Sequence, residues 1–541
     1  MAPIPPPGSD AEIRRFHELQ EQLRASFLRF SRDPAQPYTA VVIPSQSFDP
    51  RELAKIPGVA HYEERSLFNL MLLRHPRLNV VYVTSKRLNP LIIDYYLHQM
   101  RGVPSEHARR RLLLLDCDDA STRPLTSKIL ERPRLIQRIK ERIQTGDMAH
   151  MVVFNCSPLE RSLAVKLGIP INACDPDLAS LGSKTGSRQI FKEAGLRPAP
   201  GREGLRDTGD LVDALEELWR ERPAMRRAVV KLDDSFSGEG NAILELRGDP
   251  ALASVAPGEA SPAARARALR EALPRLRFEA RGLTWPEYQA QFEAMGGVCE
   301  QWLDAPDDAG ALEKRSPSVQ LRINPAREVQ AVSTHDQVLG GPGGQVFMGA
   351  SFPADRRYRL AIQREALKAG RALARRGAIG RAAIDFLAVP RPEAERAAAA
   401  KRPRDPDEAP EYELYAVEIN LRQGGTTHPF NTLKFITDGR YDERSGLFFT
   451  AQGRERCYFA TDTLAQPEYR GILPFDLMDL LVVHGFHFRS DETGVVFHLL
   501  GCLSEFGKLG CTVIAPTVPE AKLLYAETIA LLDRATGRTP S

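Results

Sequence analysis

In its C-terminal third the chain reads Glu418-Ile419-Asn420-Leu421-Arg422-Gln423-Gly424-Gly425-Thr426-Thr427-His428-Pro429, directly after an apolar run at residues 414–417. If residues 412–420 form a strand, the two-residue repeat puts the side chains of Glu418 and Asn420 on one face. Two oxygen ligands side by side are typical of a magnesium site.

A second β-rich segment, residues 382–389, carries a single acid, Asp385, among apolar neighbours. A carboxylate in such surroundings is costly unless it is paired, hydrogen-bonded or bound to a metal. We therefore predict that Asp385, Glu418 and Asn420 hold Mg²⁺ ions that bridge nucleotide phosphates. The alternative is an ordinary two-stranded edge with exposed acids, and these residues alone favour neither interpretation.

The composition limits the classes of partner. Lys and Arg number 73 and Asp and Glu number 70, and the charges are interspersed, so nothing indicates a protein that binds nucleic acid or a membrane surface. The seven cysteines include no CxxC pair and fit a reducing compartment. Residues 1–9 lack the features of a signal peptide, and no apolar run is long enough to span a membrane. We expect a cytoplasmic protein with small-molecule partners.

Residues 37–180 follow an N-terminal tail and helix (residues 1–36) and alternate short apolar runs with helical patterns. This alternation predicts a parallel, wound sheet, which binds ligands beyond the carboxyl ends of its strands. One such end contains Asp116, Asp118 and Asp119, which either contact a ligand or cap the next helix. No GxGxxG motif follows the first strand, so a dinucleotide site is not predicted.

A new unit begins near Ser183, and its strand at residues 228–232 carries Lys231. The strand runs into a loop of small and polar residues at 233–241. Backbone N–H groups of such a loop close over phosphate oxygens, while the lysine supplies a point charge. A glycine-containing hairpin is the alternative interpretation.

Three further segments complete the pattern. Residues 340–344 are a candidate lid over a site. Residues 390–411, rich in Pro, Ala and charge, predict a disordered insertion. The last unit contains His484, His487 and His498, whose spacing is not diagnostic of zinc and favours core or surface histidines.

Lys184, Lys231, the loop at 235–241, the segment Glu300 to Leu303, Asp385 and Glu418-x-Asn420 follow one another in an order that resembles the ATP-grasp superfamily of carboxylate–amine ligases. Within it, the chain looks most like the peptide ligases of pheganomycin biosynthesis. The resemblance implies an α/β architecture, with an ATP-grasp fold of two α+β subdomains that sandwich ATP at residues 181–440. A Rossmann-like parallel-sheet pre-ATP-grasp domain (37–180) would precede it, and a small α+β C-terminal domain (441–541) would follow.

The resemblance also implies roles for individual residues. The phosphate contacts would be Lys184, Lys231, Ser235, Ser237, Gly238, Glu239, Gly240 and Asn241. The adenine and ribose contacts would be Glu300, Gln301, Trp302, Leu303 and Asp304. Arg422 matches a cation beside the transferring phosphoryl group, and we expect Arg322 to orient the substrate carboxylate with it. We further predict that His428 positions or deprotonates the amine. Relatives often have Glu where this chain has Asp385, a shorter side chain that alters the metal spacing.

The implied reaction uses ATP and Mg²⁺. A substrate carboxylate attacks the γ-phosphate to give an acyl phosphate and ADP, and an amine then forms the amide. Amino acids or peptides are the expected substrates, and a homodimer is one expectation because dimers are common in the superfamily. Two alternatives stay open: a carboxylase or phosphotransferase built on the same nucleotide site, and a non-catalytic nucleotide-binding module.

Overall fold

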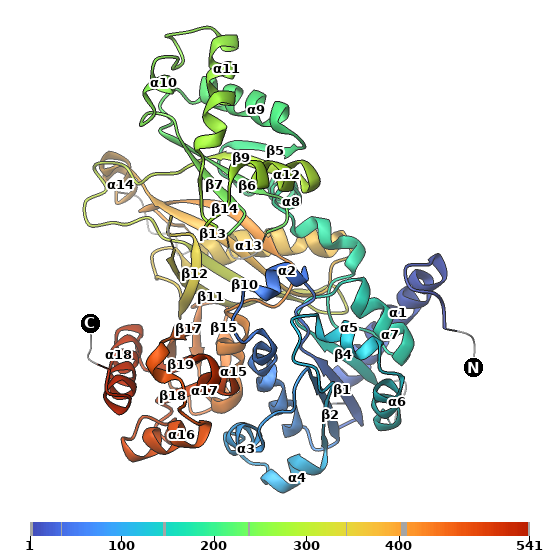
Figure 1. The fold of residues 1–541 in the computed structure, drawn as a ribbon. Coiled ribbons are helices and arrows are strands. Elements are labelled where there is room, and N and C mark those ends of the chain that lie inside the picture. Colours follow the sequence, from blue (N-terminus) through green and yellow to red (C-terminus); the bar gives the residue numbers. More distant parts are fainter. Residues whose placement is uncertain are drawn as a thin grey trace.

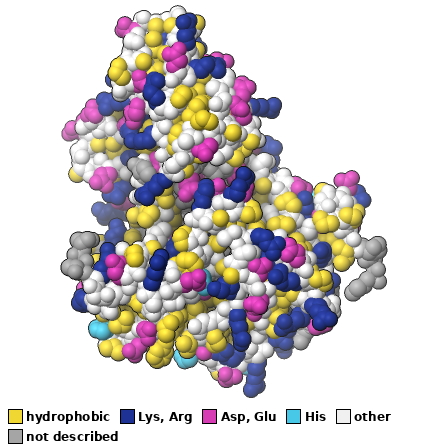
Figure 2. Space-filling model, in the orientation of Figure 1, with side chains coloured by type: hydrophobic (Ala, Val, Ile, Leu, Met, Phe, Trp, Pro, Cys, Tyr) yellow, Lys and Arg dark blue, Asp and Glu magenta, His cyan; other side chains and the backbone are white. Residues whose placement is uncertain are grey.

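The computed structural model describes residues 4–33, 35–143, 148–235, 238–341, 343–401 and 408–538. Within these ranges the chain builds a four-stranded, a five-stranded and an eight-stranded sheet, with helices packed between and around them (Figure 1). Acidic and basic side chains are interspersed over the face shown in Figure 2, which is hollowed below the small upper lobe. None of the helices in the described part of the chain is both long and apolar enough to cross a membrane.

The N-terminal sheet is parallel throughout and has the strand order β3-β2-β1-β4. Its strands are β1 (Tyr38–Ile43), β2 (Leu78–Thr84), β3 (Leu112–Asp116) and β4 (Ala149–Val153). Its helices are α1 (Asp10–Arg32), α2 (Pro50–Ala54), η1 (Val59–Arg74), α3 (Pro90–His98), α4 (Ser105–Arg110), α5 (Leu125–Leu130), α6 (Pro133–Arg142) and α7 (Pro158–Leu167). Val41 and Val81 are fully buried because helices cover both faces, which confirms the predicted wound sheet.

The acids at the end of β3 act locally. The carboxylate of Asp119 accepts a hydrogen bond from the backbone N–H of Ser121 and pairs with Arg123 and Arg132. Asp119 therefore stabilises the turn after β3, and the predicted helix cap is not found, because the N-cap residue of α5 is Pro124.

The five-stranded sheet is antiparallel, has the order β5-β9-β6-β7-β8 and forms the small upper lobe in Figure 1. Its strands are β5 (Gly201–Leu205), β6 (Arg227–Leu232), β7 (Asn241–Glu245), β8 (Arg277–Phe278) and β9 (Gly297–Gln301). The accompanying helices are η2 (Pro176–Gly182), α8 (Lys184–Ala194), α9 (Thr208–Glu221), α10 (Pro250–Ala253), α11 (Pro262–Ala272), η3 (Leu273–Arg275) and α12 (Trp285–Met295). Trp219, Tyr288 and Phe292 lie in the core of this lobe.

The eight-stranded sheet has the order β14-β13-β10-β11-β12-β17-β19-β18, with every neighbouring pair antiparallel. Its strands are β10 (Pro317–Ile323), β11 (Val329–Gly340), β12 (Val346–Phe352), β13 (Gly380–Pro390), β14 (Tyr412–Asn420), β17 (Cys457–Ala465), β18 (Gly494–His498) and β19 (Lys508–Ala515). Helix α13 (Arg359–Arg375) packs on β10 and β11, and α15 (Thr427–Thr437) follows β14.

The C-terminal segment, predicted as a small α+β domain from residue 441, contributes β17, β19 and β18 to this sheet. Ala460 of β17 pairs with Ala350 of β12, so no break in the sheet separates the two parts. Its remaining elements are β15 (Arg440–Asp442), β16 (Leu447–Phe449), η4 (Pro467–Tyr469), α16 (Pro474–Val483), α17 (Leu500–Phe506) and α18 (Val518–Ala535). One core holds Tyr82 of β2 together with Phe430 and Val513, because the segment packs against the N-terminal part.

The expected disordered insertion at 390–411 contains helix α14 (Glu393–Ala399), so this prediction is wrong for that segment. Ala, Glu and Arg favour helix formation, which explains the helix despite the low apolar content. The backbone N–H of Glu393 and the guanidinium of Arg396 both donate to Asp308. Residues 402–407 lie outside the described ranges.

Candidate functional site

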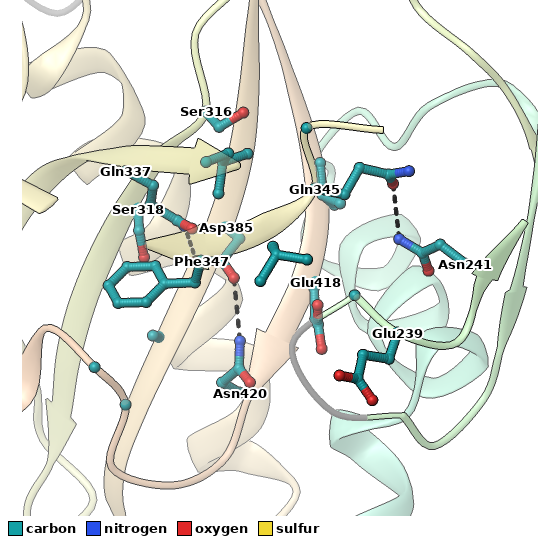
Figure 3. Close-up of a pocket in the computed structure, with 18 of the residues that line it drawn as sticks. Glu239, Asn241, Ser316, Ser318, Gln337, Gln345, Phe347, Asp385, Glu418 and Asn420 are labelled. Atoms are coloured by element: carbon teal, nitrogen blue, oxygen red, sulfur yellow. Dashed lines mark hydrogen bonds between the residues drawn. The ribbon is translucent and has the colours of Figure 1, made fainter. Parts of the chain in front are cut away.

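A cavity of about 640 Å³ lies where the small lobe, the eight-stranded sheet and the N-terminal part meet. Figure 3 shows some of the residues that line it. Most of the residues predicted for the site line it. They are Lys184, Lys231, Gly238, Glu239, Asn241, Glu300, Gln301, Trp302, Leu303, Asp385, Glu418, Asn420 and Arg422. Predicted residues that are far apart in sequence, such as Lys184 and Arg422, are thus brought to one cavity.

The three predicted metal ligands lie on neighbouring strands. Asp385 on β13 stands opposite Glu418 on β14, and Asn420 follows Glu418 on the same strand. The carboxylate of Asp385 accepts hydrogen bonds from Asn420 Nδ2 at 3.1 Å and from Gln337 Nε2 at 2.9 Å (Figure 3). Two carboxylates and an amide oxygen form a donor set that suits Mg²⁺, so these residues fit the metal.

The two carboxylates differ electrostatically. Burial raises the pKa of Asp385 to about 6, and the nearby charge of Glu418 adds to this effect. Burial alone would also raise the pKa of Glu418, but Lys184 outweighs it and the pKa lies below its ordinary value. Lys184 is the first residue of α8, and its Nζ lies 2.6 Å from Glu418 Oε1.

Glu300 positions the second lysine. Its carboxylate is 2% exposed and lies 2.6 Å from Lys231 Nζ and 2.5 Å from Arg188 Nη1. Burial opposes the charged form, yet Lys231 and Arg188 together lower the pKa of Glu300. The Glu300 side chain, predicted among the adenine contacts, is therefore committed to two cations and orients Lys231 in the cavity.

The hinge after β9 provides an apolar and aromatic wall. Leu303 packs with Ala199, Val389 and Tyr415. The Trp302 ring has Lys314 Nζ 4.4 Å and the Arg227 guanidinium 4.9 Å from its centroid, and its buried Nε1 has no hydrogen-bond partner. Such a wall suits a flat, heteroaromatic base.

Asp304 does not line the cavity, because its carboxylate pairs with Arg227. The ribose contact predicted for Asp304 therefore has no support from its position.

The predicted phosphate loop meets the predicted lid. Gly238 has φ +81°, and a Cβ there would lie 2.9 Å from the carbonyl oxygen of Gln345. Asn241 Nδ2 donates to Gln345 Oε1 at 2.8 Å, while the buried Asn241 Oδ1 and Ser235 Oγ have no partner (Figure 3). Unsatisfied buried polar atoms beside glycines fit a loop that contacts a phosphate.

The remaining loop residues are less informative. At Gly240 a Cβ would meet Ser235 at 2.3 Å, so the turn requires glycine. Glu239 lies 3.7 Å from Lys55 Nζ on the opposite side of the cavity. Ser237 lies outside the described residues.

The structure places Arg322 outside the cavity, so its position does not support the predicted role. Its guanidinium lies 5.8 Å from the Phe27 ring on α1. Ser318 of the same strand lines the cavity, but Arg322 is four residues farther along, about 13 Å at about 3.3 Å per residue.

His428 also lies outside the cavity, so its predicted role with the amine is not supported. Its Nε2 is 2.9 Å from His498 Nε2, and the two rings pack edge to face. Burial lowers the pKa of both imidazoles, that of His498 to about 4. Helix α15 begins at Thr427 and directs His428 into the core against β18.

Several residues that line the cavity were not predicted. Arg65 comes from η1, Asp462 from β17 and Lys508 from β19. They carry no local motif, because single charged residues in separate helices and strands resemble ordinary surface charges. The close approach of the C-terminal strands to η1 brings them together.

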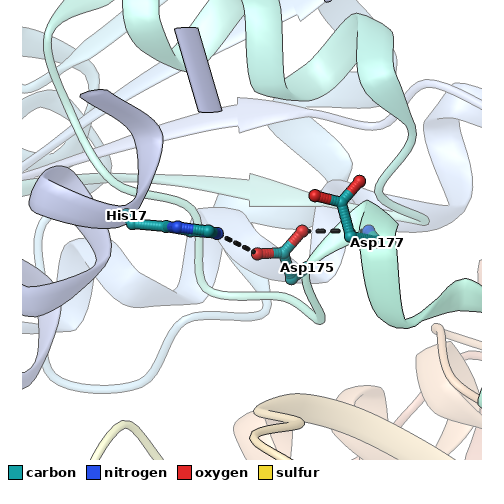
Figure 4. Close-up of side chains that lie close together, drawn as sticks. All are labelled: His17, Asp175 and Asp177. Carbon is teal, nitrogen blue, oxygen red and sulfur yellow. Dashed lines mark hydrogen bonds and ion pairs between the residues drawn. The ribbon is translucent and has the colours of Figure 1, made fainter. Parts of the chain in front are cut away.

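One further cluster, His17, Asp175 and Asp177, lies on the surface (Figure 4). Arg161 Nη1 lies 2.8 Å from Asp177 and 3.9 Å from Asp175, so a side-chain cation already lies beside both acids. His17 Nε2 lies 3.0 Å from Asp175 and links α1 to η2. Within the described ranges, His484, His487 and His498 do not group as metal ligands.

Comparisons with known proteins agree with the geometry of this site. The family model described as "IQCH-like, ATP-grasp" matches residues 176–256, and the model "PGM1 C-terminal domain" matches residues 476–528. The L-propargylglycine–L-glutamate ligase of Streptantibioticus cattleyicolor is 29% identical over 93% of this chain and 95% of its own length.

Two more distant proteins are similar over part or most of the chain. The IQ motif-containing protein H of Danio rerio is 23% identical over 70% of this chain and 38% of its own length. A crystal structure of biotin carboxylase from Campylobacter jejuni superposes with a TM-score of 0.48 at 12% identity, covering 90% of each chain. An ATP-grasp model thus matches the segment that carries Lys184 and Lys231, and a ligase is similar along nearly its whole length, so the comparisons support a likeness to the ATP-grasp superfamily.

Proposed function

We propose that this protein is an ATP-dependent carboxylate–amine ligase that joins amino acids or peptides through an acyl phosphate. The observation that carries the proposal is the convergence of two lysines, one arginine and the Asp385/Glu418/Asn420 set in one cavity. Phosphoryl transfer to an anionic carboxylate requires charge neutralisation and alignment, which this set of side chains supplies.

Each side chain has a definite part in this proposal. Lys184 and Lys231, held by Glu418 and Glu300, would bind phosphate oxygens of ATP. Asp385, Glu418 and Asn420 would hold Mg²⁺, which supplies neutralisation of the phosphate charge. The Arg422 guanidinium lies 5.6 Å from the Phe48 ring and 5.9 Å from the Phe154 ring. Packed in this way, Arg422 would orient the substrate carboxylate toward the γ-phosphate.

The reaction balances without a protein nucleophile. A carboxylate oxygen attacks the γ-phosphorus, the bond to the bridging oxygen breaks, and ADP leaves. The amine nitrogen then attacks the carbonyl carbon, the C–O bond to phosphate breaks, and phosphate leaves with the former carboxylate oxygen. The amine proton passes to phosphate or solvent.

The test is amide formation by the purified protein with Mg·ATP. The name of the Streptantibioticus relative directs attention to L-propargylglycine and L-glutamate, which are supplied together and within a pool of the common amino acids. We expect one ADP and one phosphate per amide, and turnover lower by about 100-fold or more in the Glu418→Gln variant. ADP release that depends on bicarbonate and gives no amide would instead indicate a carboxylase.

Two further expectations accompany the proposal. All seven cysteines are free, and six of them are buried, which suits a reducing compartment such as the cytoplasm. A homodimer stays a prediction, and light scattering of the purified protein would test it.

A further inference from the structure

The cavity extends beyond Arg422 along a row of cations separated by aromatic rings. The guanidinium groups of Arg422 and Arg65 lie 5.9 Å and 5.5 Å from the Phe154 ring. Arg65 and Lys508 in turn lie 4.4 Å and 4.8 Å from the Tyr62 ring. All five side chains line the cavity, so one wall carries three positive charges in a row.

The charges on this wall do not cancel. Arg65 Nη1 pairs with Asp462 Oδ2 at 2.8 Å, and the Asp462 side chain is 9% exposed. The ammonium of Lys508 donates its hydrogen bond to the Tyr62 hydroxyl at 2.5 Å, a neutral acceptor. Asp462, the carboxylate that attracts both cations, cannot neutralise the two of them. A positive charge is thus left over at the end of the cavity distant from the Asp385 set.

An uncompensated ammonium in this position is costly. Burial lowers the pKa of Lys508, which means that its surroundings disfavour the charged form. Lys508 differs from the buried Lys128, which donates to three acceptors, because the Tyr62 hydroxyl is its one hydrogen-bond partner among the described residues. An anion from a ligand would complete the surroundings of Lys508.

The two ends of the row differ in what they face. Arg422 is attracted by Glu418 and Asp385 and stands at the phosphoryl-transfer end. Lys508 stands at the other end, where η1, β17 and β19 meet. A molecule that places an anion at Lys508 and Arg65 would therefore present its other end toward the carboxylate held at Arg422.

We propose that Lys508 and Arg65, with the Tyr62 hydroxyl, bind the free carboxylate of the amine substrate. The attacking substrate is then an α-amino acid or a peptide with a free C-terminus, and a simple amine is a poor substitute. This inference rests on the proposed ligase function, because it assigns the second substrate of that reaction.

The experiment compares carboxylate and ester forms of one nucleophile. Each amino acid that the wild-type enzyme accepts as the amine is assayed beside its methyl ester, and the ratio of the two kcat/KM values is taken. The wild-type enzyme should favour the free acid by about 100-fold, the value of two charge-assisted hydrogen bonds. Lys508→Met should reduce this ratio to about 5-fold or less, chiefly by raising the KM of the acid.

Two variants control for damage to the fold. Lys508→Arg keeps a positive donor and should retain most of the preference. Lys86→Met removes a nearby lysine that does not line the cavity, and it should leave the ratio at the wild-type value. Thermal unfolding of all three variants checks that each is folded under the assay conditions.

The outcomes separate the inference from the proposed function. If the wild-type enzyme forms amides but Lys508→Met keeps the full preference, or if the wild type already accepts esters equally well, the inference is overturned and the ligase function stands. If Lys508→Met instead raises the KM of the acid substrate and leaves the preference among amine substrates unchanged, Lys508 binds a carboxylate of the acid substrate and the inference is overturned. If the wild-type enzyme forms no amide with any amino acid pool, both fall.

Discussion

Asp385 and Glu418 stand opposite each other on β13 and β14, yet their pKa values are shifted in opposite directions. Burial and its neighbour raise the pKa of Asp385 to about 6, whereas Lys184 keeps Glu418 charged. Two like charges on adjacent strands are unfavourable unless a cation lies between or beside them. The pair is therefore suited to a divalent cation, with Lys184 already balancing one of its members.

The first prediction concerns this pair. Asp385→Asn and Glu418→Gln each remove one charge from the metal-binding set, so turnover at saturating ATP should fall by about 100-fold or more. Steady-state ADP release over a Mg²⁺ titration is the measurement. Asp385→Glu keeps the negative charge, so its turnover should fall less than that of either amide variant. Equal turnover in wild type and Asp385→Asn would show that Asp385 holds no metal.

The second prediction concerns Glu300. Glu300→Gln leaves Lys231 and Arg188 without their shared carboxylate, and breaking a buried pair costs about 3–5 kcal/mol. The free energy of unfolding should fall accordingly, and the KM for ATP should rise about tenfold or more because Lys231 is no longer held in place. The Glu203 carboxylate also pairs with Arg188 but does not line the cavity, so Glu203→Gln is the matched control. A wild-type KM for ATP in both variants would show that Glu300 does not position Lys231 for ATP binding.

The third prediction separates two arginines. Arg422→Lys replaces a planar guanidinium packed near Phe48 and Phe154, and kcat should fall by about 100-fold. Arg322→Lys alters a contact with Phe27 on α1, outside the cavity, and should change kcat by less than about threefold. Parallel measurements of kcat on the two variants test this contrast. A large loss in Arg322→Lys with an intact fold would restore its predicted role.

The fourth prediction uses the buried histidine pair. Because the pKa of His498 is about 4 in the folded protein and about 6.5 unfolded, the folded state binds fewer protons between these values. The contribution of neutral His498 to the free energy of unfolding is thus fully present above pH 6.5 and is lost as the pH falls toward 4. At pH 5 the loss relative to pH 7.5 is about 2 kcal/mol for His498.

His498→Gln should reduce the fall in unfolding free energy between pH 7.5 and pH 5 by about that amount. Urea denaturation at the two pH values measures it. The exposed His484→Gln is the control and should behave as the wild type. An unchanged pH dependence in His498→Gln would mean that the pair does not remain neutral in the folded protein.

The parts of the site that the sequence could predict are those set by local periodicity and order. A strand repeats every two residues, so Glu418 and Asn420 share a face whatever surrounds them, and Asp385 stands out among apolar neighbours. The lysine before a glycine-containing loop likewise follows from adjacent residues at 231–241.

The errors arose where local pattern does not determine distance or helix direction. Alternation along β10 shows which face Arg322 lies on but not how far it lies from the cavity. The glycines at 424 and 425 precede helix α15, and they gave no indication that His428 lies in a helix. The Lys508 end of the cavity could not be foreseen, because Lys508 and Tyr62 are 446 positions apart. The same long-range packing joined the C-terminal strands to the eight-stranded sheet.

The most direct test of the central claim follows the carboxylate oxygen. The acid substrate is labelled with ¹⁸O in its carboxylate, and the products of one round of amide formation are analysed by mass spectrometry. An acyl phosphate requires one ¹⁸O atom in inorganic phosphate for each amide formed, with none in the nucleotide. Label in AMP would indicate an acyl adenylate, and unlabelled phosphate with unlabelled nucleotide would contradict activation of the carboxylate by ATP.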